Sequence, residues 1–300
     1  MGIAGYPPVR HLLSDLGIEA ESIAESDTVA RIRATPHIAG ADGGVRAGVL
    51  ATLVDLVGGS EAIRAARPDR MVTADLTLQV VRPAVGPFVE ARGRVVRRGR
   101  TTLVVEAWVF NVSGDGSDAT ADARDTPPVA WATMTFAIHA GKQSRPSGDE
   151  GPELPARWSF TGAGLEGPVV ETLCLSETGV AEGEVSMPVG EYLLNSFGAV
   201  QGGVMALLAE VAALRAFEAG VGHDGAAVTD LQVAYLATGR VGPIVSRARV
   251  LVGTSGDGVG SGGSRRNAVV ELVDEGDGGR LTTVVNVGAV SPGPPAEDPA

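Results

Sequence analysis

Cysteine, aromatic residues and long apolar runs are all scarce in this 300-residue sequence. The single cysteine, Cys174, excludes an internal disulfide and a thiolate metal cage. Aromatic residues make up 4% of the chain, which predicts a core of Val, Leu and Ala. No apolar run reaches the roughly 18 residues that a membrane span needs, and the first residues lack a charged segment followed by a hydrophobic one. We therefore expect a cytoplasmic protein with no membrane partner.

Positive charge is scarce as well. The chain carries 24 basic and 36 acidic residues, for a formal net charge of −12. Proteins that bind the phosphate backbone normally show the opposite balance, so nucleic acid is a poor candidate partner. The histidines show no spacing typical of metal ligands, which predicts no metal site. They are His11, His37, His139 and His223.

Glycine and proline are abundant, with 42 and 18 residues respectively. This predicts many short elements and turns. Residues 140–155 have the composition of a linker and lie at the midpoint of the chain, and the last ten residues are rich in proline and acid. We predict domains at 1–140 and 158–290, a linker at 141–157 and a disordered tail at 291–300.

The two halves resemble each other. Residues 45–55, VRAGVLATLVD, align with residues 200–210, VQGGVMALLAE, at an offset of 155 without a gap. The register continues where Asp75-Leu76 meets Asp230-Leu231, and with a one-residue slip where Gly86-Pro87 meets Gly242-Pro243. Such a register is typical of tandem duplication and predicts two copies of one fold.

Each copy repeats the same pattern of elements. A short strand, at 28–35 or in two pieces within 169–186, leads through a glycine-rich turn into an Ala- and Leu-rich segment long enough for a helix, Val45–Ala66 or Val200–Gly220. Alternating Val- and Thr-rich segments follow and predict strands at 71–81, 88–97, 101–111 and 129–139, then at 226–237, 244–252, 267–273 and 281–290. Because the helix carries little charge, we expect an α+β fold in which an antiparallel sheet wraps it.

Each predicted helix contains a carboxylate among apolar neighbours. Asp55 and Glu210 occupy the same repeat position, and neither has a basic residue three or four positions away. Burying an unpaired carboxylate costs several kcal/mol. A structural role is common for one such residue, but its recurrence in both copies favours a function.

The helix starts are rich in small residues, Ala47-Gly48 and Gly202-Gly203. Exposed N–H groups and the positive end of the helix dipole at such a start suit a developing oxyanion. Close packing against a neighbour explains the same glycines equally well. Asn195 precedes Gly202 by seven residues and can donate and accept hydrogen bonds, whereas its repeat counterpart, Gly40, can do neither.

These residues resemble the signature of hotdog-fold acyl-CoA thioesterases of the phenylacetate-pathway and 4-hydroxybenzoyl-CoA thioesterase type. That signature is Asn-x5-His/Gln-Gly-Gly followed by Asp or Glu eight residues after the first glycine. Residues 195–203 running on to Glu210, and Gly48 to Asp55, carry the resemblance. It covers both halves and implies two tandem hotdog folds, each with a long central helix wrapped by an antiparallel sheet.

The resemblance also implies sites composed of both units. One unit contributes the Asn and the glycine N–H, and the other contributes the helix carboxylate and a Ser or Thr on the following strand. One complete site then consists of Asn195, Gln201 and Gly202 with Asp55 and Thr73. The reciprocal site consists of Glu210 and Thr229 with Gly40, Arg46 and Ala47. Because the second set lacks the Asn, we expect one competent and one degraded site.

The implied chemistry is hydrolysis of an acyl-CoA to free acid and coenzyme A, with no cofactor beyond the coenzyme A of the substrate. The thioester carbonyl would accept the Gly202 N–H, and Asp55 would activate water or attack the carbonyl directly, two routes that the sequence does not separate. Further substrate contacts are expected at Gly203, Gly48, Ala47 and Thr229. Arg98 and Arg100 are expected to meet coenzyme A phosphates, although a solvated hairpin end explains them too.

Two other functions stay open at this stage. A non-catalytic acyl-CoA-binding or scaffold protein would also explain the loss of Asn at one site. A hotdog hydratase or dehydratase is disfavoured because its Gly-Asp-x-Asn-Pro-x-His motif is absent. Since such units commonly pair, we also expect a homodimer of double-hotdog chains.

Overall fold

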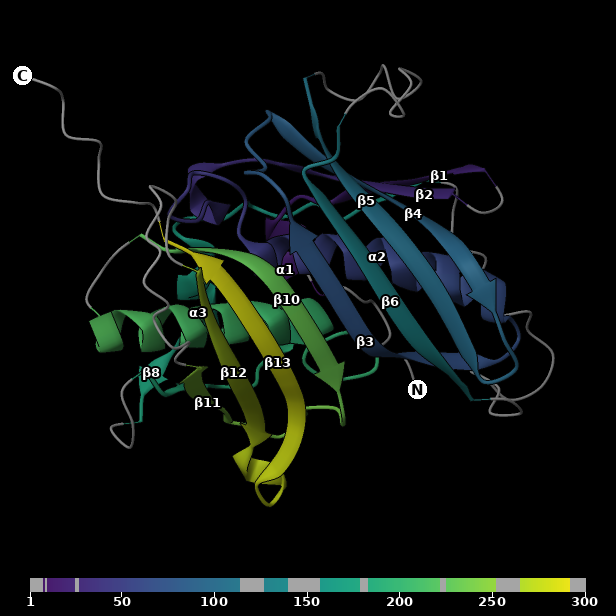
Figure 1. Cartoon of the computed structure of the whole chain (residues 1–300). Helices are drawn as coiled ribbons and strands as arrows, with labels where there is room; N and C mark the ends of the chain where they lie inside the picture. The colour runs from purple at the N-terminus through teal and green to yellow at the C-terminus, as the bar shows by residue number, and fades with distance from the viewer. Residues whose placement is uncertain are drawn as a thin grey trace, which may run out of the picture.

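The computed structural model describes residues 8, 10–24, 27–113, 127–139, 157–178, 183–221, 225–251 and 265–291. Within these residues the chain forms one antiparallel sheet of 13 strands with two long helices packed on it, as Figure 1 shows. The predicted linker apart from Arg157, the tail beyond residue 291, and His223 lie outside the described residues.

The first unit matches the predicted order of elements. Helix α2, Ala47–Ala66, packs against the strands of its own unit, and the predicted helix and the strands that follow it are confirmed to within two residues. Its elements are α1 Leu12–Asp15, β1 Glu19–Ala24, β2 Asp27–Arg33, η1 Pro36–Ile38, α2, β3 Arg70–Val80, β4 Phe88–Arg98, β5 Thr102–Val112 and β6 Ala130–His139. Of these, α1 and β1 were not predicted from the sequence.

The second unit repeats this order with one correction. The segment Val169–Leu173, predicted as part of a strand, is the 3-10 turn η2, because Pro168 precedes it and Cys174 ends it in the left-handed region at φ 49°. The other elements are β8 Ser176–Glu177, β9 Val185–Met187, η3 Glu191–Leu193, α3 Gly202–Val221, β10 Ala227–Tyr235, β11 Ile244–Leu251, β12 Arg265–Asp274, η4 Glu275–Asp277 and β13 Arg280–Val290.

Strands β3 and β10 join the two units into one sheet. The strand order is β7-β1-β2-β4-β5-β6-β3-β10-β13-β12-β11-β9-β8, where β7 is Arg157–Ser159. Leu76 pairs with Val233, and Leu78, the repeat counterpart of Val233, pairs with Leu231, the counterpart of Leu76. The units are therefore related by an approximate two-fold axis between Thr77 and Gln232, as in an isologous dimer.

Strand β7 lies at the far edge of the sheet, next to β1 of the first unit. The chain that follows the predicted linker therefore contacts the first unit before it enters the second. The proposed boundary at residue 158 stays a prediction.

Helices α2 and α3 contact each other near their first turns, and glycine makes the contact possible. A β-carbon on Gly48 would overlap the backbone of Leu207, and one on Gly203 would overlap Thr52, the repeat counterpart of Leu207. The close-packing explanation of these two glycines is thus confirmed. Their position fixes how the first turn of each helix meets the second turn of the other.

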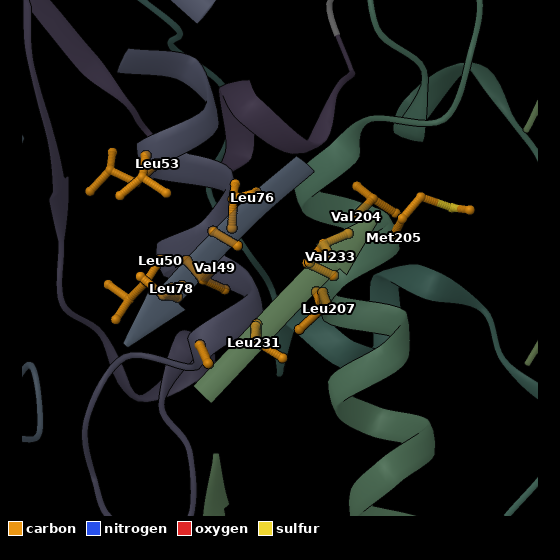
Figure 2. Packing of buried hydrophobic residues seen from close by; sticks show 14 of the residues in the cluster. Val49, Leu50, Leu53, Leu76, Leu78, Val204, Met205, Leu207, Leu231 and Val233 are labelled. Atoms are coloured by element: carbon orange, nitrogen blue, oxygen red, sulfur yellow. The ribbon is translucent and has the colours of Figure 1, made fainter. Parts of the chain in front are cut away.

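One continuous hydrophobic core runs through both units. In Figure 2, β3 and β10 lie side by side with apolar side chains of α2 and α3 around them. The labelled side chains are Val49, Leu50, Leu53, Leu76, Leu78, Val204, Met205, Leu207, Leu231 and Val233. No helix in the described part of the chain has the length and apolar character needed to cross a membrane.

Candidate active site

Asp55 projects from the third turn of α2 and is only partly buried. Thr73 Oγ1 donates a hydrogen bond to Asp55 Oδ1 at 3.1 Å. The pairing of β3 with β6 shifts register between Thr73 and Asp75, so Thr73 faces the same side of the sheet as the buried Leu76. The structure therefore brings Asp55 and Thr73 together as predicted.

The environment of Asp55 changes its acidity. Burial raises the pKa of Asp55 to about 6, while the hydrogen bond from Thr73 acts in the opposite direction by favouring the ionised form. A carboxyl with this pKa is mostly ionised at neutral pH and still accepts a proton readily. These are the properties of a general base.

The first residue of α3, Gly202, lies directly opposite Asp55 across the unit boundary. A β-carbon on Gly202 would lie 3.1 Å from Asp55 Oδ2 and 2.9 Å from Tyr235 Oη. Because any larger residue would meet these two oxygens, glycine keeps the helix start open to both. We call Asp55, Thr73, Gln201, Gly202 and Tyr235 the Asp55 site.

Tyr235, at the end of β10, was not predicted from the sequence. Its hydroxyl is buried and has no hydrogen-bond partner among the described residues. Burial, together with the nearby Asp55 carboxylate, raises the pKa of Tyr235 well above its ordinary value, so the phenol stays protonated. A comparison of the two repeats could have pointed to it, because the counterpart of Tyr235 at the 155-residue offset is the apolar Val80.

Gln201 precedes Gly202 and is buried. Its Nε2 lies 3.3 Å from His11 Nε2, which is 2.8 Å from the carbonyl oxygen of Leu194. The N–H of Leu13 donates to His11 Nδ1 at 3.2 Å, so the ring proton lies on Nε2 and donates to Leu194. Burial also lowers the pKa of His11. A neutral histidine near the N-terminus thus packs beside Gln201, a contact that was not predicted from the sequence.

Asn195 shapes the turn that leads to α3. Its Oδ1 accepts hydrogen bonds from the N–H groups of Phe197 at 2.9 Å and Ala199 at 3.2 Å. In the first unit, where Gly40 replaces Asn195, the carboxylate of Asp42 accepts the N–H of Gly44 at 3.0 Å instead. The structure gives Asn195 this turn contact and, among the described residues, no hydrogen bond to Asp55.

Glu210 occupies the corresponding place in the second unit but has different partners. Its Oε2 accepts the N–H of Gly48 at 2.7 Å, and its Oε1 accepts Arg46 Nη1 at 3.3 Å. Burial nevertheless raises the pKa of Glu210, outweighing Arg46 and the Gly48 N–H, which favour the ionised form. We call Glu210, Arg46, Ala47 and Gly48 the Glu210 site.

Thr229 was predicted to share a site with Glu210, and among the described residues its hydroxyl makes hydrogen bonds elsewhere. Its hydroxyl donates to Asp230 Oδ2 at 2.8 Å. The register explains the difference, since the counterpart of Thr73 at the 155-residue offset is Val228, and Thr229 corresponds to Ala74 at the bulge. Within the part of the chain that the structure describes, Val228 therefore stands at the Glu210 site where Thr73 stands at the Asp55 site.

A cavity of about 250 Å³ lies beside the Glu210 site. Its lining includes Arg46, Ala47, Glu210, Gly40 and Val80. Val80 lies here where the Asp55 site has Tyr235. The two sites are thus related by the repeat, and each has a helix carboxylate, but the side chains around the two carboxylates differ.

Arg98 and Arg100 are exposed at the turn between β4 and β5. Arg98 pairs with Leu103, Leu103 with Phe136, and Phe136 with Thr73, so Arg98 and Thr73 share one row across four strands. Three strand spacings make this about 14 Å. The arginines lie outside the Asp55 site but within reach of a long substrate.

Comparisons with known proteins agree with this architecture. The family model described as the thioesterase superfamily matches residues 43–117. A Halobacterium salinarum protein provisionally named an esterase is 36% identical over 132 residues, which cover 41% of this chain and 82% of that protein.

Two solved structures extend the likeness over both units. The tesB protein of Mycobacterium avium subspecies paratuberculosis has a TM-score of 0.59 at 13% identity, covering 91% of this chain and 95% of its own. An acyl-ACP thioesterase from Bacteroides thetaiotaomicron has a TM-score of 0.53 at 13% identity, and the match covers 89% of this chain and 100% of that one. At this identity the likeness concerns the fold. The relative, the family model and the fold together show that this chain, with its two hotdog units, belongs to the thioesterase superfamily.

Proposed function

We propose that the chain hydrolyses acyl-CoA thioesters at the Asp55 site. The observation that carries the proposal is the juxtaposition of the Asp55 carboxylate, from one unit, with the start of α3 at Gly202, from the other. A base and an oxyanion donor held close together are the two groups that thioester hydrolysis needs.

The helix start supplies the electrophilic side of the reaction. The Gly202 N–H is among the first of α3, where the helix dipole is positive, and it would donate to the carbonyl oxygen of the thioester. Negative charge develops on that oxygen as the carbonyl carbon becomes tetrahedral. The same donor then favours the transition state over the ground state.

Asp55 supplies the nucleophilic side of the reaction. In the base route its carboxylate accepts a proton from water as the water oxygen attacks the carbonyl carbon, and the C–S bond then breaks to release coenzyme A thiolate. In the nucleophilic route Asp55 attacks the carbon itself, forming an anhydride that water hydrolyses. Thr73 orients the carboxylate in either route. Asn195 and Gln201 would position the loop before Gly202.

We assign the coenzyme A end of the substrate to Arg98 and Arg100. Both side chains are exposed, and the strand spacing separates the backbone of Arg98 from that of Thr73 by about 14 Å. A thioester bound at Gly202 has its nucleotide phosphates at the far end of an extended arm. Arginine binds phosphate oxygens through paired N–H groups.

The Glu210 site is proposed to be inactive. The Gly48 N–H at its helix start already donates to Glu210, and the carboxylate is also paired with Arg46. A substrate carbonyl would have to displace this carboxylate. One active site per chain follows, and the pairing of two chains into a homodimer stays a prediction that the mass in solution tests.

The decisive experiment measures release of free thiol from a panel of acyl-CoAs. Wild type should turn over at least one acyl chain, and Asp55→Asn should reduce kcat about 10²- to 10⁴-fold, the usual contribution of a general base. If the chain binds acyl-CoAs in calorimetry but cleaves none, the binding-protein alternative is correct. If Asp55→Asn keeps full activity, the assignment of the site is wrong.

A further inference from the structure

The hydroxyl of Tyr235 is a buried donor without a partner among the described residues. Leaving a buried polar group unpaired lowers stability, and phenylalanine would avoid this loss with almost the same shape. Folding therefore gives no reason for the hydroxyl. Its repeat counterpart, Val80, shows that an apolar residue is accepted at this position of the fold.

The hydroxyl also lies where the reaction would occur. A β-carbon on Gly202 would lie 2.9 Å from Tyr235 Oη and 3.1 Å from Asp55 Oδ2, so both oxygens lie next to the first residue of α3. The two groups come from different units, because Tyr235 is on β10 and Asp55 is on α2. The juxtaposition arises only where the units meet.

Resting on the function proposed above, we propose that Tyr235 is a second oxyanion donor, which acts with the Gly202 N–H. As water attacks and Asp55 takes its proton, the carbonyl π electrons move onto oxygen, which accepts hydrogen bonds from both donors. When the C–S bond breaks, the electron pair leaves with the thiolate and the carbonyl re-forms. Tyr235 keeps its proton throughout.

The surroundings of Tyr235 suit this role. Burial and the Asp55 carboxylate raise the pKa of Tyr235 well above its ordinary value, so it donates at any working pH. Asp55 is the titratable group that contributes to this shift. A donor held in place before the substrate arrives needs no reorganisation in the transition state.

The test compares wild type, Tyr235→Phe and Asp55→Asn by thiol release and by Tm. Tyr235→Phe should lower kcat about 10²-fold, the effect of losing one oxyanion donor. KM should change little, and Tm should stay or rise because the unpaired hydroxyl is gone. The acidic limb of the rate, near pH 6, should not move, since the phenol is neutral.

The matched control is Tyr192→Phe. Tyr192 donates to Asp15 Oδ2 at 2.9 Å, so its loss should lower Tm and leave kcat unchanged. An unchanged kcat in Tyr235→Phe, beside an active wild type and a slow Asp55→Asn, would overturn the role of Tyr235 alone. A drop in kcat that a drop in Tm accompanies, or a shifted acidic limb, would assign Tyr235 a packing or tuning role instead. No turnover by wild type would overturn the proposed function itself.

Discussion

Glu210 Oε2 accepts the backbone N–H of Gly48 at 2.7 Å, so a carboxylate from one unit caps the helix start of the other. At the Asp55 site a partly exposed Asp replaces the buried Glu, and its carboxylate accepts a hydrogen bond from Thr73. Its Oδ2 lies beside Gly202, one position before Gly203, which is the counterpart of Gly48. The two copies of one duplicated motif have thus acquired different carboxylate partners.

This asymmetry predicts different results for matched substitutions. Glu210→Gln should keep the turnover of wild type, because the amide oxygen still accepts the Gly48 N–H and the Asp55 site is untouched. Asp55→Asn should lose activity, by about 10²- to 10⁴-fold in kcat. Thiol release at saturating substrate measures both. An equal loss in the two variants would contradict the assignment of one active site.

The pH dependence follows from the pKa of Asp55, which burial raises to about 6. Because the ionised form is the active one, kcat/KM should rise with pH through about 6 and fall about tenfold per unit below it. Thr73→Val removes the hydrogen bond that favours ionisation of Asp55, so the acidic limb of the pH–rate profile should move to higher pH. Thr73→Ser keeps a hydroxyl and should return the limb to its wild-type position. A limb near pH 4 in wild type would show that a different carboxyl controls the rate.

Asp55 should also lower stability at neutral pH. Its pKa is about 6 in the folded chain against 3.8 as the ordinary value, so ionisation favours the unfolded state. This loss of stability is absent below pH 3.8 and grows between pH 3.8 and about 6. Above pH 6 it reaches about 2–3 kcal/mol in the free energy of unfolding. Asp55→Asn should therefore raise Tm at pH 7 and not at pH 4. Equal differences in Tm at both pH values would argue against this linkage.

The contact between α2 and α3 predicts which glycines tolerate alanine. Gly48→Ala and Gly203→Ala place a methyl group against backbone atoms of the opposite helix, so each should lower the free energy of unfolding by about 1–3 kcal/mol or more. A β-carbon on Gly59, on the same helix as Gly48, would meet no described atom within 4 Å beyond its own helix. Gly59→Ala should therefore stabilise α2, by about 0.5–1 kcal/mol. Chemical denaturation measures all three.

Arg98 and Arg100 should affect binding and not chemistry. Replacing both with Ala should raise KM for acyl-CoA a few-fold and leave kcat unchanged, since exposed ion pairs contribute about 0.2–1 kcal/mol each. High salt should reduce the difference by screening the charges. A short thioester without the nucleotide is the control, and its KM should not change. The same rise in KM for that compound would exclude a phosphate contact.

Part of the site was predictable because it lies in the repeat. Asp55 and Gly202 follow from the apolar helix pattern and the resemblance to the thioesterase signature, and the structure places both, with Thr73, in one space. Thr229 was assigned one position too far along the strand, since the 155-residue offset gives Val228 as the counterpart of Thr73 and both strands have their bulge at the same repeat position. Tyr235 was missed because it belongs to no motif and meets Gly202 only through the fold.

The duplication, the two helices and the strands that follow them could be predicted from the sequence, because apolar periodicity and a fixed repeat offset are properties of the linear chain. The partners of each carboxylate depend on tertiary contacts that no local pattern contains. Glu210 and Gly48 are 162 residues apart, and their contact depends on two glycines that let the helices approach. A buried carboxylate is costly wherever it lies, but whether a neighbour satisfies it or leaves it open for a substrate depends on atoms that folding brings together.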